Sequence, residues 1–276
     1  MKNHVGLFLL LLTCSLAVFF INMTFTDLIP LYIGIALKFG LIVFFAITSL
    51  VLYHNLRLKQ YWNIFFAFLT ASVALFGGLY LSKLGLLLLN LNTITLAGFT
   101  AYKLLEDFFI IVLIIVMTHF SANSMASLYL KKGNIKYGML IGLTSFVLLS
   151  CLAVLMMSTQ NIPLPRLLEL SPVILFIALG DGFMEELLFR GLFLKRLQPF
   201  FGSTKANIFT ALVFCLVHLQ VTFTPSLPAF LIVVFLLGIL WGYIMQQTDS
   251  LFASALFHAG ADVVIMIPFL QSYNVV

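Results

Sequence analysis

The chain has 276 residues, of which 63% are hydrophobic and only 8% are charged. Because a soluble domain carries about 25% charged residues, this composition excludes an ordinary soluble protein and predicts an all-α polytopic membrane protein. The formal net charge of +5 does not indicate nucleic-acid binding, since loop lysines and arginines set membrane orientation and meet anionic lipids.

Apolar runs in residues 1–160 predict five transmembrane helices. The first run has too long an apolar core for a cleaved signal peptide and is interpreted as a membrane helix. A span needs about 20 residues, so Lys83–Lys103, whose apolar start is short, is predicted to lie at the interface or to re-enter. The five spans are Val5–Met23, Leu31–Tyr53, Tyr61–Ser82, Asp107–Phe120 and Tyr137–Met157.

A proline-containing loop, with Pro163 and Pro165, separates these helices from a second region, residues 161–276. This region contains four further apolar runs, which gives a bundle of about 8–9 transmembrane helices. The four runs are Pro172–Leu194, Asn207–Gln220, Pro228–Met245 and Leu251–Leu270.

Basic residues follow the second, fourth and sixth predicted spans. Since cytoplasmic loops carry the excess of lysine and arginine, these three loops are predicted to be cytoplasmic, with the amino terminus inside and the carboxyl terminus outside. The loops contain Arg57 and Lys59, then Lys131, Lys132 and Lys136, then Lys195, Arg196 and Lys205.

The sixth span is apolar except for four charged residues, Asp181, Glu185, Glu186 and Arg190. A charged side chain at the centre of a bilayer costs about 2.5–3.5 kcal/mol on insertion scales, so adjacent glutamates there indicate a functional site. Glu186 and Arg190 are four residues apart and can form an ion pair on one helix face. Asp181 shares a face with Glu185 and is interpreted as a residue that lines a water path.

Two histidines are predicted at the depth of the paired glutamates. At 1.5 Å per residue, Glu185 lies about 15 Å from the inner end of its span, His218 about 16 Å and His258 about 13 Å. Asp262 follows His258 by four residues, and Phe214 precedes His218 by four. Three spans therefore bring polar groups close to the bilayer midplane. A single buried histidine is more often a packing residue, but two at the depth of paired glutamates favour a shared site.

These residues form three motifs. Glu185–Arg190 reads EExxxR, Phe214–His218 reads FxxxH, and His258–Asp262 reads Hxxx(N/D). In this order, each on its own apolar span, they resemble the CPBP family of intramembrane glutamic endopeptidases, which includes CAAX prenyl proteases, bacteriocin-processing proteins and abortive-infection proteins. The resemblance implies that residues 161–276 form a catalytic core and residues 1–160 an accessory region.

The resemblance also implies a role for each motif residue. Glu185 would be the general base that activates a water, and His218 would help to hold that water. Glu186 and Arg190 would form the supporting pair. His258 and Asp262 would stabilise the oxyanion, although the family often has asparagine in place of Asp262, and a carboxyl group donates a hydrogen bond only when protonated. No metal and no other cofactor would be needed.

Three other functions are compatible with these residues. Glu185, His218, His258 and Asp262 are possible zinc ligands, although no HExxH motif is present. The same fold could serve as a non-proteolytic membrane scaffold or immunity protein, and buried carboxylates also occur in proton-coupled transporters, which usually show internal repeats. Cys14, Cys151 and Cys215 lie in apolar runs without metal-binding spacing and are interpreted as packing residues.

The expected partners are the lipid bilayer and a membrane-associated peptide or protein substrate. The short chain and the lack of a eukaryotic targeting motif favour a bacterial plasma membrane. A peptide precursor is then a better candidate substrate than a prenylated protein. The oligomeric state is not indicated by the sequence.

Overall fold

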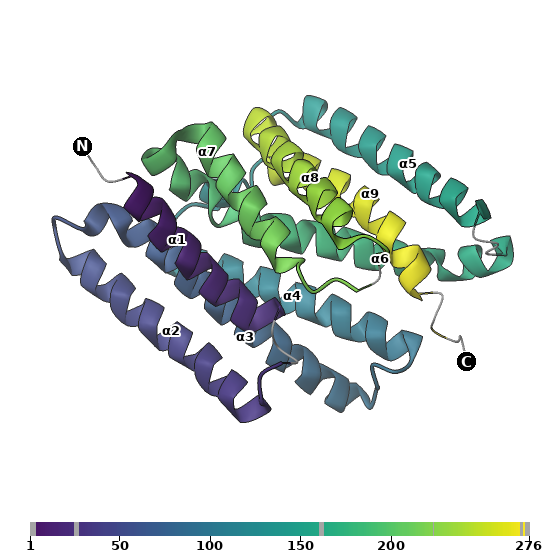
Figure 1. The fold of residues 1–276 in the computed structure, drawn as a ribbon, viewed down its shortest axis with the longest axis horizontal. Coiled ribbons are helices and arrows are strands. Elements are labelled where there is room, and N and C mark those ends of the chain that lie inside the picture. Colours follow the sequence, from purple (N-terminus) through teal and green to yellow (C-terminus); the bar gives the residue numbers. More distant parts are fainter. Residues whose placement is uncertain (1–3, 25–27, 160–162, 223, 271–272, 274–276) are drawn as a thin grey trace. The chain divides into compact units, whose positions relative to one another are not determined.

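The computed structural model describes residues 4–24, 28–159, 163–222, 224–270 and 273. Within these residues the regular structure is entirely helical, which confirms the predicted all-α bundle (Figure 1). The described α-helices are α1 (His4–Phe19), α2 (Leu31–His54), α3 (Trp62–Leu89), α4 (Leu96–Phe120), α5 (Ile135–Thr159), α6 (Leu164–Glu185), α7 (Leu194–Val217), α8 (Leu227–Thr248) and α9 (Leu251–Leu270). Four short helical turns join them: η1 (Phe20–Thr24), η2 (Lys59–Tyr61), η3 (Met125–Leu128) and η4 (Glu186–Gly191).

Seven of the described helical segments are long and apolar enough to cross a membrane. The chain is therefore an integral membrane protein. The two α-helices outside this set are α4, which carries several charged residues, and α9, whose apolar stretch Leu251–Ile267 is shorter. The spans are His4–Met23, Leu31–His54, Lys59–Leu88, Ile135–Met156, Leu164–Gly191, Leu194–Val217 and Leu227–Thr248.

The segment Lys83–Lys103, predicted to lie at the interface or to re-enter, is divided between two helices and the turn that joins them. Its first residues extend α3 to Leu89, and its last residues begin α4 at Leu96. Asn90 adopts a positive φ of 53° at the end of α3. The Thr95 hydroxyl accepts a hydrogen bond from the Gly98 amide at 3.1 Å, which caps the start of α4. The apolar start looked too short for a span because it is the end of a longer helix.

The predicted sixth span and the loop after it also differ from the structure. The α-helix ends at Glu185, and η4 continues it as a π-helical turn through Gly191. Lys195 and Arg196, predicted in a loop, lie instead in the first turns of α7. Gly202, with φ 78° and ψ 168°, breaks α7 before the predicted seventh span begins, because only glycine readily adopts this conformation.

The chain divides into two compact units that interleave in sequence. The first unit contains residues 1–77, 113–128 and 188–243, and the second contains residues 78–112, 129–187 and 244–276. The predicted boundary between residues 160 and 161 lies outside the described residues.

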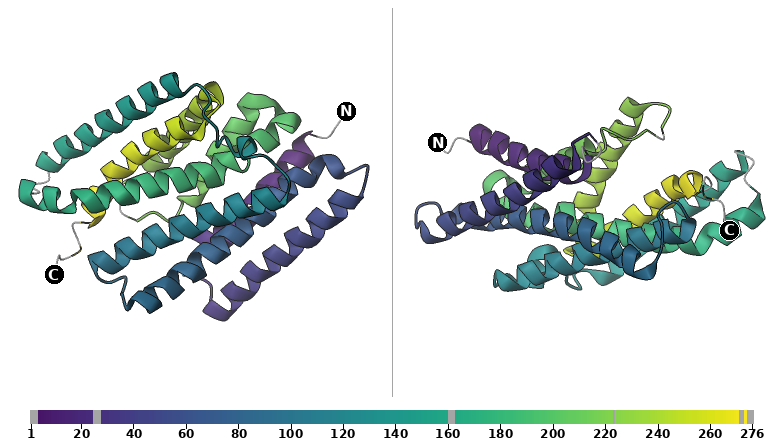
Figure 2. Two further views of the ribbon diagram at one scale, coloured as in Figure 1. Left: turned by 180° about the vertical axis from the view of Figure 1, so that it is seen from behind. Right: turned by 90° about the horizontal axis from the view of Figure 1, so that it is seen from below.

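In the second unit, α9 lies between α5 and α6, as Figure 1 and the left view of Figure 2 show. Small residues allow these helices to approach closely. A Cβ atom on Gly182 would lie 2.7 Å from the Ala259 backbone nitrogen, and one on Gly260 would lie 2.8 Å from Phe146 Cα. Buried aliphatic side chains, among them Ile174 of α6, fill the remaining space. The close packing fixes the end of α6 against the middle of α9.

In the first unit, aromatic stacking joins the end of α1 to the residues around η4. The rings of Phe19 and Phe189 stack with centroids 4.6 Å apart. Gly238 and Gly242 form a GxxxG pair on α8 that packs closely against α7, because a Cβ atom on Gly238 would lie 3.2 Å from the Ala211 Cβ. One turn later, Gly242 makes room for Asn207, which donates a hydrogen bond to the Ile239 carbonyl at 2.9 Å. This contact anchors α7 to α8.

Candidate active site

The centre of the candidate site in the second unit is His258 of α9. Its Nδ1 lies 3.0 Å from Glu186 Oε1, and its Nε2 lies 3.3 Å from Glu185 Oε2. The imidazole is therefore held between the two adjacent glutamates at the end of α6. His258 and Glu186 are buried, with 3% and 0% of their side chains exposed, whereas Glu185 keeps 18%. Of the two glutamates, Glu185 is thus the one that can meet water or substrate.

The contacts of His258 indicate more than one proton in this cluster. A neutral imidazole carries a single N–H, yet both ring nitrogens of His258 face carboxyl oxygens. Either the imidazole is doubly protonated or one of the two carboxyl groups is protonated. In both cases two protons are shared among three groups, which is an arrangement suited to moving protons during a reaction.

Asp262 lies one helical turn after His258 on α9. Its Oδ1 is 3.7 Å from His258 Nε2. Its Oδ2 is buried and has no hydrogen-bond partner among the described residues. A buried polar atom without a partner is costly, so Oδ2 marks a position that a water or a substrate group would satisfy.

A second buried polar cluster adjoins the first through α6. Lys103 of α4 places its Nζ 2.7 Å from Asp181 Oδ1 and 3.7 Å from Asp107 Oδ1. Its Nζ also lies 3.6 Å from Glu106 Oε2. Asp181 precedes Glu185 by four residues on α6, so the two side chains share a face of that helix. The lysine thus neutralises part of the negative charge that surrounds the paired glutamates.

Arg190 belongs to the first unit and is completely buried. Its Nη2 donates to the Gly238 carbonyl at 3.3 Å. Its guanidinium carbon lies 4.4 Å from the centroid of the Phe214 ring and 5.5 Å from that of Trp241. Cation–π contacts of this kind stabilise a desolvated guanidinium by about 2 kcal/mol. The guanidinium is therefore rigidly held.

His218, also in the first unit, terminates α7. Its Nδ1 lies 2.8 Å from the Phe214 carbonyl oxygen, and its ring packs 4.7 Å from the Phe214 ring. Because a carbonyl only accepts hydrogen bonds, Nδ1 carries the proton in this contact. In the neutral tautomer Nε2 is then a hydrogen-bond acceptor. The FxxxH spacing thus orients the histidine and selects its tautomer.

The six predicted site residues all lie within residues 167–264, which match the model of a protein family described as type II CAAX prenyl endopeptidase Rce1-like. Over these residues the chain is similar to this Rce1-like family. The match confirms the family that the three motifs indicated. No curated protein and no solved structure matches the chain.

Within this Rce1-like region, the structure brings four of the predicted residues together in the second unit: Glu185, Glu186, His258 and Asp262. Arg190 and His218 lie in the first unit. The predicted ion pair between Glu186 and Arg190, and the predicted approach of His218 to Glu185, stay predictions. Among the described residues, no group of three or more His, Cys, Asp or Glu side chains is arranged to hold a metal ion.

The partners of Asp181 were not anticipated from the sequence. Lys103 and Asp107 lie on α4, outside the Rce1-like region, so neither motif nor family match points to them. The available signal was the run KLLED, residues 103–107, which places three charged residues inside an apolar helix. Charged residues within a membrane helix indicate a polar neighbour, and here that neighbour is Asp181.

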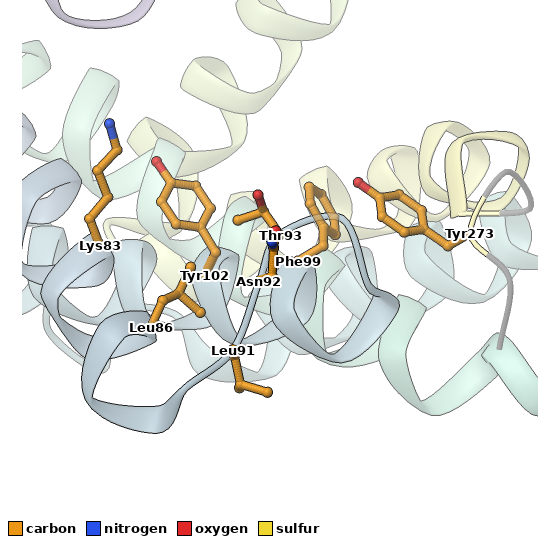
Figure 3. A pocket seen from close by; sticks show the side chains of 8 residues that line it. All are labelled: Lys83, Leu86, Leu91, Asn92, Thr93, Phe99, Tyr102 and Tyr273. Atoms are coloured by element: carbon orange, nitrogen blue, oxygen red, sulfur yellow. The ribbon is translucent and has the colours of Figure 1, made fainter. Parts of the chain in front are cut away.

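A cavity of about 610 Å³ lies beside this second cluster, over the turn between α3 and α4. Figure 3 shows Tyr102 among its lining residues, with Lys83 and Tyr273 to either side. The Tyr102 hydroxyl donates to Glu106 Oε1 at 2.9 Å, and Glu106 in turn contacts Lys103. Polar contacts therefore continue from the cavity to Asp181, one turn before Glu185.

Replacement of Lys103 by methionine should destabilise the protein by about 2 kcal/mol. The change leaves Asp107 and Asp181 buried beside one another without their cation, and the partial exposure of Lys103 keeps the effect below the 3–5 kcal/mol typical of a fully buried pair. Thermal unfolding in detergent measures the loss. Lys83→Met, the same change at an exposed position of α3, is the matched control. Equal stability of Lys103→Met and wild type would show that the cluster does not depend on the lysine.

Proposed function

We propose that this protein is an intramembrane endopeptidase in which Glu185 activates a water that hydrolyses a peptide bond. The observation that carries the proposal is the position of His258, held between Glu185 and Glu186 at 3.3 Å and 3.0 Å within the Rce1-like region. Adjacent carboxylates with a shared histidine, buried in an apolar bundle, are a general acid–base system.

In the proposed reaction Glu185 accepts a proton from the water as the water oxygen attacks the carbonyl carbon. The carbonyl becomes an oxyanion, which an N–H of His258 stabilises, with Asp262 as a second polar group at the same position. Glu185 then returns the proton to the leaving nitrogen as the C–N bond breaks. The products are a carboxyl group and an amine, and Glu185 is restored. Glu185 has this role because it is the more exposed glutamate.

The other motif residues position this machinery. Glu186 is fully buried and fixes the His258 ring through Nδ1. His218 is proposed to hold the attacking water, since the contact of its Nδ1 with Phe214 leaves Nε2 as the acceptor. Arg190 is proposed to balance the charge of Glu186. Preorganised groups of this kind lower the barrier because they need not reorient during the reaction.

The proposed substrate is a membrane-associated peptide or protein, and the proposed location is a bacterial plasma membrane with the amino terminus in the cytoplasm. The matched family carries the name of prenyl endopeptidases, so prenylated peptides are the other substrate class to test. Purified protein in liposomes should cleave peptides of one of these classes, and Glu185→Ala should not. Mass spectrometry of the products identifies the bond. Cleavage that persists in Glu185→Ala would contradict the proposal.

The proposed mechanism predicts activity without added metal. A zinc enzyme would use the ion to lower the pKa of its bound water to about 7, which is the task assigned here to Glu185. Chelators should therefore leave the cleavage rate unchanged, and metal analysis of active protein should find less than stoichiometric zinc. Loss of activity on chelation, with recovery on addition of zinc, would instead favour a metalloprotease.

A further inference from the structure

A second polar cavity, of about 300 Å³, lies in the first unit, and none of its lining residues is one of the six predicted site residues. Its walls come from the start of α3, the segment around η3 and the first turns of α7. The lining residues are Gln60, Asn63, Asn123, Ser127, Lys195, Arg196, Pro199 and Phe200. The volume is at the lower end of the range of about 300–1,000 Å³ for small-ligand sites.

Arg196 is the most informative residue of this cavity. Only 8% of its surface is exposed. Its Nη1 donates to the Leu192 carbonyl at 2.7 Å and lies 3.4 Å from the Gly191 carbonyl, while its Nη2 contacts Ser127 Oγ at 3.4 Å. Among the described residues, no carboxylate forms an ion pair with it. A guanidinium has five N–H donors, so these neutral acceptors do not use its full capacity or balance its charge.

The composition of the first unit explains this lack of a counter-ion. Its described residues contain no aspartate or glutamate, and the unit's one acidic residue, Asp27, lies outside the described residues. A buried charge is strongly unfavourable unless it is paired. The arginine therefore needs an anion that the described part of the unit does not supply.

The other lining groups suit an oxyanion. Lys195 adds a second cation, and its Nζ donates to the Ala126 carbonyl at 2.7 Å, which fixes it at the cavity wall. Asn63 and Asn123 contribute amide groups that lie 3.3 Å apart. Two basic residues with amide and hydroxyl donors match the several acceptor oxygens of a phosphate group, which arginine binds with two parallel hydrogen bonds.

The position of the cavity corresponds to the level of lipid headgroups. Its walls are formed where membrane helices begin, since the spans Lys59–Leu88 and Leu194–Val217 both start among its lining residues. The ring of Phe200 stacks on Tyr61, with centroids 5.3 Å apart and planes 14° apart. Tyrosine and tryptophan are enriched at membrane–water interfaces, so Tyr61 and Trp62 mark this depth.

We propose that this cavity is a phosphate-group site, and that the headgroup of an anionic bilayer lipid is its source. Basic pockets between membrane helices bind such headgroups. Arg196 would contribute the main charge and Lys195 the second, while Pro199 and Phe200 would contact the glycerol. The site is independent of the proposed peptidase activity.

The test is thermal unfolding of the delipidated full-length protein in a neutral detergent with three probes: dihexanoyl-phosphatidylglycerol, dihexanoylglycerol and inorganic phosphate. Phosphatidylglycerol should raise the unfolding temperature, whereas dihexanoylglycerol, which lacks the phosphate, should not. Because charge-assisted hydrogen bonds are lost, Arg196→Gln should bind phosphatidylglycerol about tenfold more weakly or worse. Arg57→Gln, the same change at an exposed arginine of this unit, should match wild type.

A second variant keeps the test decisive if Arg196→Gln does not fold. Asn123→Asp is nearly isosteric and places a carboxylate in the cavity. It should abolish stabilisation by the lipid and raise stability in its absence. Stabilisation by inorganic phosphate equal to that by phosphatidylglycerol would support the site and assign it to soluble phosphate. No response of wild type to either anion, or equal weakening in Arg57→Gln, would overturn the proposal.

Discussion

Glu185→Gln is expected to lower the rate of peptide cleavage by about a hundredfold to ten-thousandfold, the range for loss of a positioned general base. The amide keeps the size of the side chain but cannot accept a proton from water. Substrate binding should change little, so the loss should appear in kcat rather than KM. Steady-state kinetics with a cleaved peptide in liposomes measure both constants.

The control for this prediction is folding. Glu185 keeps 18% of its side chain exposed, so the glutamine should be tolerated and the unfolding temperature should stay close to that of wild type. Glu186→Gln is the matched comparison at the fully buried neighbour, and it should reduce stability as well as activity because Glu186 fixes His258. A fully active Glu185→Gln, or a stronger rate loss in a stable Glu186→Gln, would exchange the roles of the two glutamates.

The sequence predicted the helices because apolar runs of the length of a bilayer have few alternatives. It failed where two helices were joined without a charged loop. Around Lys83–Lys103 the chain turns within six polar and apolar residues, Asn90–Thr95, and hydropathy does not mark such a turn. After Glu185 the chain changes to a π-helical turn without leaving the apolar surroundings. Neither event changes the apolar character of the sequence, so hydropathy reveals neither of them.

Part of the candidate site could be predicted because charged residues are rare in membrane helices, so each one indicates a polar site. Glu185, Glu186, His258 and Asp262 were found by that criterion and are in contact. The counter-charge of Asp181 was not found, because Lys103 looked like the end of a surface segment. Whether a lysine is at an interface or inside the bundle depends on helix rotation, which hydropathy does not determine. The polar partners of each buried charge depend on how the helices pack.

Arg190 illustrates the same dependence on packing within the first unit. From the sequence it was expected only as the partner of Glu186. In the structure its side chain has the largest volume among the fully buried side chains of the described residues. It lies against Phe214 and Trp241. Gly238 leaves the space for it, since a Cβ atom there would lie 2.9 Å from Arg190 Nη2. Gly238 therefore leaves space for the Arg190 guanidinium and also allows α8 to pack closely against α7.

Arg190→Ala is expected to destabilise the protein by about 3–5 kcal/mol, the range for removing one partner of a buried ion pair, here the pair proposed with Glu186. The change removes two cation–π contacts and a hydrogen bond to the Gly238 carbonyl, and it leaves a cavity where the guanidinium was. Expression level and thermal unfolding in detergent measure the effect. Arg57→Ala, at an exposed arginine of the same unit, should stay within about 0.5 kcal/mol of wild type. Arg190→Lys should recover part of the loss, because it keeps the charge but not the planar stacking. A well-folded but inactive Arg190→Ala would show instead that the arginine acts directly in the reaction.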